Sequence, residues 1–215
     1  EMYKAFSDLI IPAYNATTGR LVCFGKESEI KLKGAAFATS AAPYYFAGYK
    51  EGETLYLDGG IIANNPALNL FKDKDFLNAV KNGRPVYVLS INTGTCYKSK
   101  NFKNFEKLGG GKLVFNIQEF LSMIMDGTSY NTNEILTNLK EGLKGRFHFV
   151  SIQTSIDDNS LDNATPDNLN HLSLRAKEEF DNHQNNSESG LKDFIKMVKQ
   201  VALDGRLLQK RIERY

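Results

Sequence analysis

The sequence has no tryptophan, only two cysteines and no long apolar run. Cys23 and Cys96 stand far apart and belong to no CxxC pair, so the pattern argues against a disulfide framework and a structural zinc site. A membrane-spanning helix needs about 20 mostly apolar residues, and no stretch provides them. The first residues also lack the basic and apolar regions of a secretory signal. We therefore expect a soluble, cytoplasmic protein.

The chain also has no strong excess of charge of either sign. The chain of 215 residues carries 27 Lys and Arg against 25 Asp and Glu, a formal net charge of +2. This excess is too small to favour a polyanion as partner. With 41% hydrophobic residues, the length suits one domain with a sizeable core.

The hydrophobic pattern predicts strands that alternate with helices. Residues 8–25 predict a hairpin around Gly19, and residues 34–46 a short helix followed by a turn at Pro43. Further strands are predicted at 54–58, 84–94 and 145–156. The strand at 84–94 is almost continuously apolar, which is typical of a strand covered on both faces in a parallel or mixed sheet. The order of elements favours an α/β fold.

Three helix signals follow the predicted strands. Asn65 is placed to cap a helix that begins at Pro66, and Thr165 precedes a second helix that begins at Pro166. Residues 182–190 predict a polar loop. The last helix is predicted to be amphipathic and to pack on the core through Leu191, Phe194, Ile195, Val198 and Ala202.

The stretch LYLDGG places Asp58 at the end of a strand and before two glycines. In open α/β sheets, active sites gather at the carboxyl ends of strands. Gly59 and Gly60 would let the backbone turn sharply and leave the carboxylate uncrowded. The competing interpretation is that Asp58 is a turn residue whose side chain caps its own backbone.

Four segments decide between these interpretations. ATSAAPYYF at 38–46, LYLDGGIIANNP at 55–66, VLSINTGT at 88–95 and LDNATPDNLNHL at 161–172 follow one another in the order and approximate spacing of patatin-like phospholipases. The chain resembles the later part of that catalytic domain. The third segment departs from the family pattern, because Asn92 replaces a glycine before Thr93 and Gly94.

This resemblance implies a three-layer α/β/α sandwich that is incomplete here, because the N-terminal part with the nucleophile elbow is missing. Residues 1–215 would then be the C-terminal portion of a single domain. It further implies a lipid acyl hydrolase, of phospholipase A or lysophospholipase type, that uses a Ser–Asp dyad without metal or cofactor. Asp58 matches the dyad aspartate and general base. The residues that match the supporting motif are Gly59, Gly60, Asn64, Asn65 and Pro66.

The serine partner of this dyad is not evident. The family places it in a G-x-S-x-G elbow, and no serine in the 215 residues has that setting. Ser129 comes nearest, but Asn131 stands where the final glycine should be, and we expect a turn at Asp126 and Gly127. Ser40 is a poor nucleophile candidate. The glycines at 109–111 follow Asp58 and suit a flexible connection better than an oxyanion loop.

The histidines and the basic segments offer no substitute. The three histidines, His148, His171 and His183, pair recognisably with no serine. The lysines and aromatics of 96–108 could suit single-stranded nucleic acid or an anionic lipid surface, but a solvated loop or helix face explains them better. The basic residues of 205–215 could lie on a membrane, yet an ordinary surface helix also explains them.

We therefore expect an acyl hydrolase whose substrate is a phospholipid or another acyl-ester lipid. It would touch the membrane surface peripherally and associate with a missing N-terminal segment or another chain. Because the sequence begins at Glu1, we expect an excised piece, inactive alone, with uncovered apolar surface or strand edges. The alternative is a non-catalytic lipid-binding or interaction module that has lost the nucleophile. Nucleic-acid binding is the weakest hypothesis and is not adopted.

Overall fold

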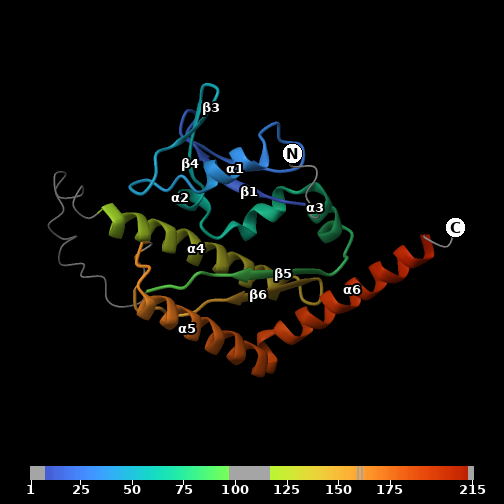
Figure 1. Cartoon of the computed structure of the whole chain (residues 1–215). Helices are drawn as coiled ribbons and strands as arrows, with labels where there is room; N and C mark the ends of the chain where they lie inside the picture. The colour runs from blue at the N-terminus through green and yellow to red at the C-terminus, as the bar shows by residue number, and fades with distance from the viewer. Residues whose placement is uncertain (1–7, 97–116, 159, 161, 213–215) are drawn as a thin grey trace. The chain divides into compact units, whose positions relative to one another are not determined.

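The structure is a computed structural model that describes residues 8–96, 117–158, 160 and 162–212 (Figure 1). For residues 118, 119 and 205–212 it describes the backbone alone. The chain divides into two compact units. Within the described residues, the first unit contains 8–82 and 117–138, and the second contains 83–96 and 139–212. Each unit is considered by itself below.

The first unit contains a four-stranded antiparallel sheet in the order β2-β1-β4-β3. Its strands are β1 (Ile11–Asn15), β2 (Arg20–Phe24), β3 (Tyr49–Glu51) and β4 (Thr54–Asp58). The predicted hairpin is confirmed as β1 and β2, and Gly19 adopts a φ of 70° in its turn. Turns of this kind favour glycine, which reaches positive φ without a steric penalty.

Helix α1 (Leu32–Thr39) packs on this sheet, as the sequence predicted for the segment before Pro43. Small residues make the close packing possible: Ala35 and Ala38 are fully buried with Ala13 of β1. Phe24 and Tyr56 close the same core with an edge-to-face contact, their ring centroids 5.4 Å apart. This small core fixes β1 and β4 beneath the helix.

Four further helices belong wholly or mainly to the first unit. They are α2 (Gly60–Ala63), the 3-10 helix η2 (Pro66–Lys72), α3 (Lys74–Lys81) and most of α4 (Ile117–Gly142). The predicted cap is confirmed, because the Asn65 side chain accepts a hydrogen bond from Ala67 N, although the helix that follows is 3-10. Helix α4 runs without interruption through Asp126 and Gly127, so the turn predicted there is wrong.

The second unit is built on two parallel strands, β5 (Val86–Ile91) and β6 (Phe147–Ile152). The parallel pairing confirms what the apolar run predicted. Burial alternates along β5, where Val86, Val88 and Ser90 are buried. The expectation that both faces of this strand are covered is therefore only partly right. Tyr87 and His148 stack between the two strands, with ring centroids 4.3 Å apart.

Helix α5 (Pro166–Asn185) begins after Thr165, as predicted, and extends into the segment expected to be a polar loop. A short 3-10 helix, η5 (Ser187–Ser189), connects it to α6 (Leu191–Ile212). The predicted packing face of α6 is only partly right. Leu191 is fully buried, but Val198 and Ala202 are exposed, so the helix is anchored through its first turns.

These elements confirm an α/β fold. The sheet that carries Asp58 is antiparallel, however, whereas we had expected Asp58 at the carboxyl end of a buried strand in an open α/β sheet. Among the helices of the described residues, none is both long enough and apolar enough to cross a membrane.

Candidate active site

Asp58 is the last residue of β4, at the point where the strand gives way to helix α2. Its backbone is held on both sides. Asp58 stands opposite Ala13 of β1 in the sheet register, and its N–H donates to the carbonyl oxygen of Ala41 at 3.0 Å. Two separate segments of the first unit therefore fix the position from which the carboxylate extends.

The Asp58 carboxylate is partly buried and makes one hydrogen bond. Its Oδ1 accepts from Gly60 N at 2.7 Å, whereas Oδ2 has no hydrogen-bond partner among the described residues. Partial burial raises the pKa of the Asp58 carboxyl above its ordinary value of 3.8, and the bond from Gly60 opposes this to a smaller extent. The Oδ1 contact is the turn contact of the competing interpretation. The second oxygen, however, remains available as a proton acceptor.

The two glycines after Asp58 are required for different reasons. A Cβ on Gly59 would lie 2.3 Å from the carbonyl oxygen of Pro12, so β1 leaves no room for a side chain there. A Cβ on Gly60 would lie 3.1 Å from Asp58 Oδ1 and 2.9 Å from Met125 Cε. Gly59 therefore serves the approach of β1, and Gly60 lets its N–H reach the carboxylate.

Two asparagines that follow α2 connect this turn to helix α4. Asn64 Nδ2 donates to Ser129 Oγ at 3.0 Å and to the Met125 carbonyl oxygen at a longer 3.4 Å. Asn65 Nδ2 donates to Asn133 Oδ1 at 2.9 Å, while Pro66 begins η2. The motif residues 58–66 therefore form a compact turn secured by α4. We had not predicted this role for α4, because Ser129 and its neighbours were expected to lie in and around a turn.

Ser129 does not act as the partner of Asp58 in this arrangement. It lies inside α4 with 5% of its surface exposed, and its hydroxyl accepts from Asn64. The elbow of a serine hydrolase instead exposes its hydroxyl at a strand-to-helix turn. Ser40 is also engaged, because its Oγ donates to the Ala36 carbonyl oxygen at 2.7 Å. Among the described residues, no serine is hydrogen-bonded to the Asp58 carboxylate.

An open hollow of about 350 Å³ adjoins this strand end in the first unit. We call it the apolar hollow, and its lining residues are Phe37, Ser40, Ala41, Phe46, Ala47, Gly48 and Tyr49. Asp58 does not line it. The hollow and Asp58 are linked through Ala41, which lines the hollow and whose carbonyl oxygen accepts from Asp58 N.

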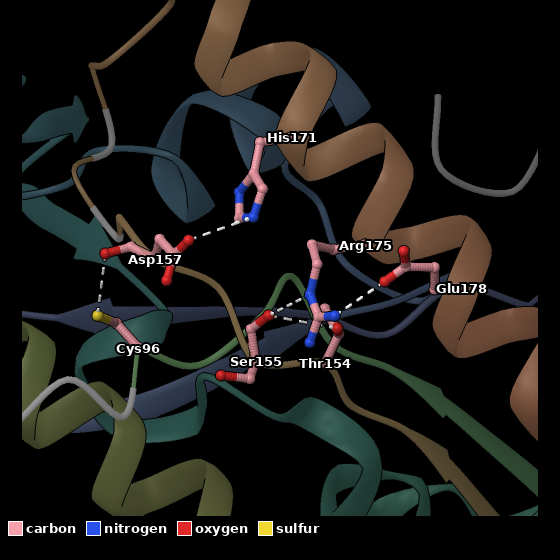
Figure 2. A network of polar contacts seen from close by, with 7 residues as sticks. All are labelled: Cys96, Thr154, Ser155, Asp157, His171, Arg175 and Glu178. Carbon is pink, nitrogen blue, oxygen red and sulfur yellow. Dashed lines mark hydrogen bonds and ion pairs between the residues drawn. The ribbon is translucent and has the colours of Figure 1, made fainter.

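A different polar network lies in the second unit, after the ends of β5 and β6 (Figure 2). His171 Nε2 is 3.3 Å from Asp157 Oδ2, and Cys96 Sγ donates to the Asp157 carbonyl oxygen at 3.5 Å. Arg175 extends from α5, donating through Nε to the Ser155 carbonyl oxygen at 3.1 Å and through Nη1 to Glu178 Oε2 at 2.8 Å. Each charged group in this network already has a partner, so the network fastens α5 to the loop after β6.

The remaining sequence candidates either have other contacts within the second unit or lie outside the described residues. His148 stacks on Tyr87 in β6, and His183 pairs with Glu179 of its own helix at 3.4 Å. The glycines at 109–111 and the basic segment after Cys96 lie outside the described residues, as do the side chains from 205 onward. In the described parts of the chain, no group of three or more His, Cys, Asp or Glu residues is arranged to hold a metal ion.

Comparison with known proteins identifies the class. No protein-family model matches the sequence. A cGAMP-activated phospholipase of Escherichia coli is 31% identical over 223 aligned positions, which cover 88% of this chain and 60% of the relative. One of Vibrio cholerae is 29% identical over 234 positions, covering 90% and 61%. A third, of Pseudomonas aeruginosa, is 35% identical over 96 positions, covering 40% and 28%.

These relatives are phospholipases, and two of them match nearly the whole chain. The comparison supports the predicted resemblance to patatin-like phospholipases, which the four motifs had indicated. It spans about three fifths of the length of the Escherichia coli and Vibrio cholerae relatives.

Proposed function

We propose that this chain is part of a lipid acyl hydrolase in which Asp58 is the general base of a Ser–Asp dyad. The state of the Asp58 carboxylate is the observation that carries the proposal. Gly60 N–H holds one oxygen, the other oxygen has no partner among the described residues, and partial burial raises the pKa of the carboxyl. A fixed carboxylate with raised basicity suits proton abstraction near neutral pH.

The reaction follows from the chemistry of this carboxylate. A serine hydroxyl attacks the ester carbonyl carbon of the lipid while its proton passes to Asp58 Oδ2. The tetrahedral intermediate collapses, the C–O bond to the leaving alcohol breaks, and Asp58 returns the proton to that oxygen. A water molecule then releases the fatty acid from the acyl-serine by the same two proton transfers. Without a histidine, Asp58 serves as both base and acid.

The serine and the oxyanion-stabilising groups would come from a part of the protein outside these 215 residues. Two observations support this: the sequence contains no G-x-S-x-G, and the chain matches only about three fifths of its longer relatives. Residues 1–215 would be the C-terminal portion of one patatin-like domain, and the added part would complete a three-layer α/β/α sandwich. The added part would also associate with the first unit.

The proposed substrate is a phospholipid, because the relatives are named phospholipases. Their names also state that cGAMP activates them, and we propose the same regulation here. Turnover of a phospholipid by the full-length protein, measured with and without cGAMP, tests this regulation directly. Equal rates under both conditions would argue against the regulation and leave the dyad proposal intact.

The decisive experiment compares the full-length protein encoded by the same gene with its Asp58→Asn variant. Asparagine retains an oxygen for Gly60 N–H but accepts no proton, so hydrolysis of a phospholipid or short-chain ester should be lost. Asp157→Asn serves as a matched control in the second unit and should remain active. A full-length protein without turnover under any condition would favour the alternative, a non-catalytic lipid-binding or interaction module. Turnover that survives Asp58→Asn would refute the assigned role.

A further inference from the structure

The apolar hollow of the first unit has mostly apolar walls. Its lining includes two polar side chains, and each is already satisfied. Ser40 Oγ donates to the Ala36 carbonyl oxygen at 2.7 Å, and the Tyr49 hydroxyl donates to Glu51 Oε2. The remaining lining side chains are those of alanine and phenylalanine. The side chains of these walls offer mainly hydrocarbon contact, so the walls favour an apolar ligand.

The wall residues leave aromatic surface exposed to solvent. Phe46 has 68% of its surface exposed and Phe37 has 51%. Phe37 stacks on Tyr49 with ring centroids 5.8 Å apart, which fixes one wall of the hollow. A ligand chain lying between these rings would remove their apolar surface from water, at about 25 cal/mol for each Å².

The segment that forms the other wall is held rigidly. The carbonyl oxygen of Ala42 accepts from both Tyr45 N and Phe46 N, at 3.1 and 2.9 Å. Tyr44, which lies between Ala42 and Tyr45 in the chain, adopts a φ of 81°, which non-glycine residues rarely do. Strained backbone of this kind persists only where the surroundings enforce it, and it clusters at binding sites. The hollow is therefore formed before any ligand arrives.

The hollow is also tied to the strand that carries Asp58. At one end, Ala41 accepts the hydrogen bond from Asp58 N. At the other end, a Cβ on Gly48 would lie 2.8 Å from Leu55 Cδ1 and 3.2 Å from the Tyr56 carbonyl oxygen, so this segment packs directly on β4. A ligand in the hollow would thus have one end near the carboxyl end of β4.

The rim carries a positive charge. Lys33 Nζ lies 5.6 Å from the centroid of the Phe37 ring, beside the apolar wall. An apolar hollow with an ammonium group at its edge complements a molecule that joins a hydrocarbon chain to an anionic group. A phospholipid has this composition, with its phosphate a few bonds from its acyl esters.

From these observations we propose that the apolar hollow binds an acyl chain of the phospholipid substrate, with Lys33 facing the phosphate. The inference rests on the proposed function, because it assigns a substrate-binding surface to the same enzyme. It places the hydrocarbon between Phe37 and Phe46 and the ester toward the Asp58 end of β4. Chain-length preference would then be set by this hollow.

Binding to the full-length protein, measured by calorimetry in its Asp58→Asn variant so that no turnover intervenes, tests the proposal. The probes are dihexanoylphosphatidylcholine below its micelle concentration, hexanoate, and glycerophosphocholine, which has the same head group without acyl chains. The phosphatidylcholine should bind and glycerophosphocholine should not. Shortening the acyl chains should weaken binding by about fourfold for each methylene removed from the hollow. Hexanoate that binds as tightly as the phosphatidylcholine would overturn the assignment to phospholipid.

Three variants make the test specific. Ala47→Trp fills the hollow from an exposed position and should weaken binding by at least tenfold, whereas Ala202→Trp, an equally exposed alanine on α6, should leave it unchanged. Phe46→Ser removes one wall without disturbing a buried residue, so it provides a second test if Ala47→Trp misfolds. Unaltered binding in both hollow variants would overturn the proposal.

The Asp58→Asn variant separates this proposal from the catalytic one. It should still bind the phosphatidylcholine, because Asp58 does not line the hollow. Normal binding with lost turnover in the full-length Asp58→Asn protein supports both proposals. If that protein keeps full turnover while Ala47→Trp abolishes binding, the dyad assignment fails and the hollow stands.

Discussion

The two units of the chain use their carboxylates in different ways. In the second unit, Asp157 lies beside His171 and Glu178 pairs with Arg175, so each of these carboxylates has a side-chain partner. In the first unit, Asp58 has no basic partner among the described residues. Burial raises the pKa of its carboxyl, and only the hydrogen bond from Gly60 N lowers it. A carboxylate that is available for proton transfer therefore differs from a structural one in having no basic side chain beside it. The better-connected polar network is the structural one.

The largest expected difference between the units is in activity. In the full-length protein, Asp58→Asn should lower the turnover of a phospholipid by a factor of about 10² to 10⁴, the usual contribution of a general base. Asp157→Asn should change turnover by less than twofold, because Asp157 belongs to the structural network of the second unit, where its Oδ2 is 3.3 Å from His171 Nε2. Initial rates at saturating substrate measure both effects. Equal losses in the two variants would remove the distinction between the units.

A second difference concerns glycines. Gly59→Ala places a methyl group against the Pro12 carbonyl in the first unit and should lower the free energy of unfolding by about 1 to 3 kcal/mol. Gly145→Ala in the second unit meets no atom within 4 Å, and its φ of 76° alone should lower the stability by about 1 to 2 kcal/mol. Urea unfolding measures both changes. Activity should fall only for Gly59→Ala, since only that substitution displaces the turn beside Asp58.

A third difference is a pH dependence that belongs to Asp58. Because burial raises its folded-state pKa, the folded chain binds this proton more tightly than the unfolded chain. The corresponding stability is present below the ordinary pKa and is lost as pH rises through the folded-state value. Asp58→Asn should remove this loss, so the variant should gain stability relative to the unmodified chain as pH rises. Urea unfolding from pH 3.5 to 8 should show that the free energy of unfolding of the variant rises relative to that of the unmodified chain. A constant difference between the two would contradict the raised pKa.

The smallest effect is expected in the second unit. Glu178→Gln removes an ion pair whose side chains are 38% and 59% exposed, and exposed pairs of this kind contribute about 0.2 to 1 kcal/mol. Arg175 keeps its bond to the Ser155 carbonyl oxygen, which limits the loss further. Thermal unfolding in low and high salt should therefore show a minor change that salt reduces. A loss above 2 kcal/mol would mean that the network does more than fasten α5.

The sequence predicted the elements that local patterns define. The hairpin of β1 and β2, the strands β4, β5 and β6, and the starts of η2 and α5 follow from β-branched runs, turn residues and caps. It missed β3, whose three residues are mostly polar, and α3, where Asp73 caps the helix through Phe76 N. It also placed a turn at Gly127, where α4 simply tolerates a glycine at a modest energetic penalty.

The site was predictable only in part, for a physical reason. Asp58, its two glycines and the cap at Asn65 are local features, and the family motif identified them. The contacts that give the turn its environment are not local: Pro12 above Gly59, Ala41 on the Asp58 N–H, and Ser129 on Asn64. Strand pairing and helix packing decide these contacts, and no pattern within residues 55–66 encodes them.

The position of the Pro12 carbonyl bears on when the surroundings of Asp58 form during folding. This carbonyl lies directly against Gly59 and also accepts a hydrogen bond from Thr39 Oγ1 at 2.6 Å. Contacts between segments so distant along the chain form late, because closing the loops between them is entropically unfavourable. In the proposed enzyme, the surroundings of Asp58 would therefore be complete only after β1 has paired with β4, even in a chain whose helices have already formed.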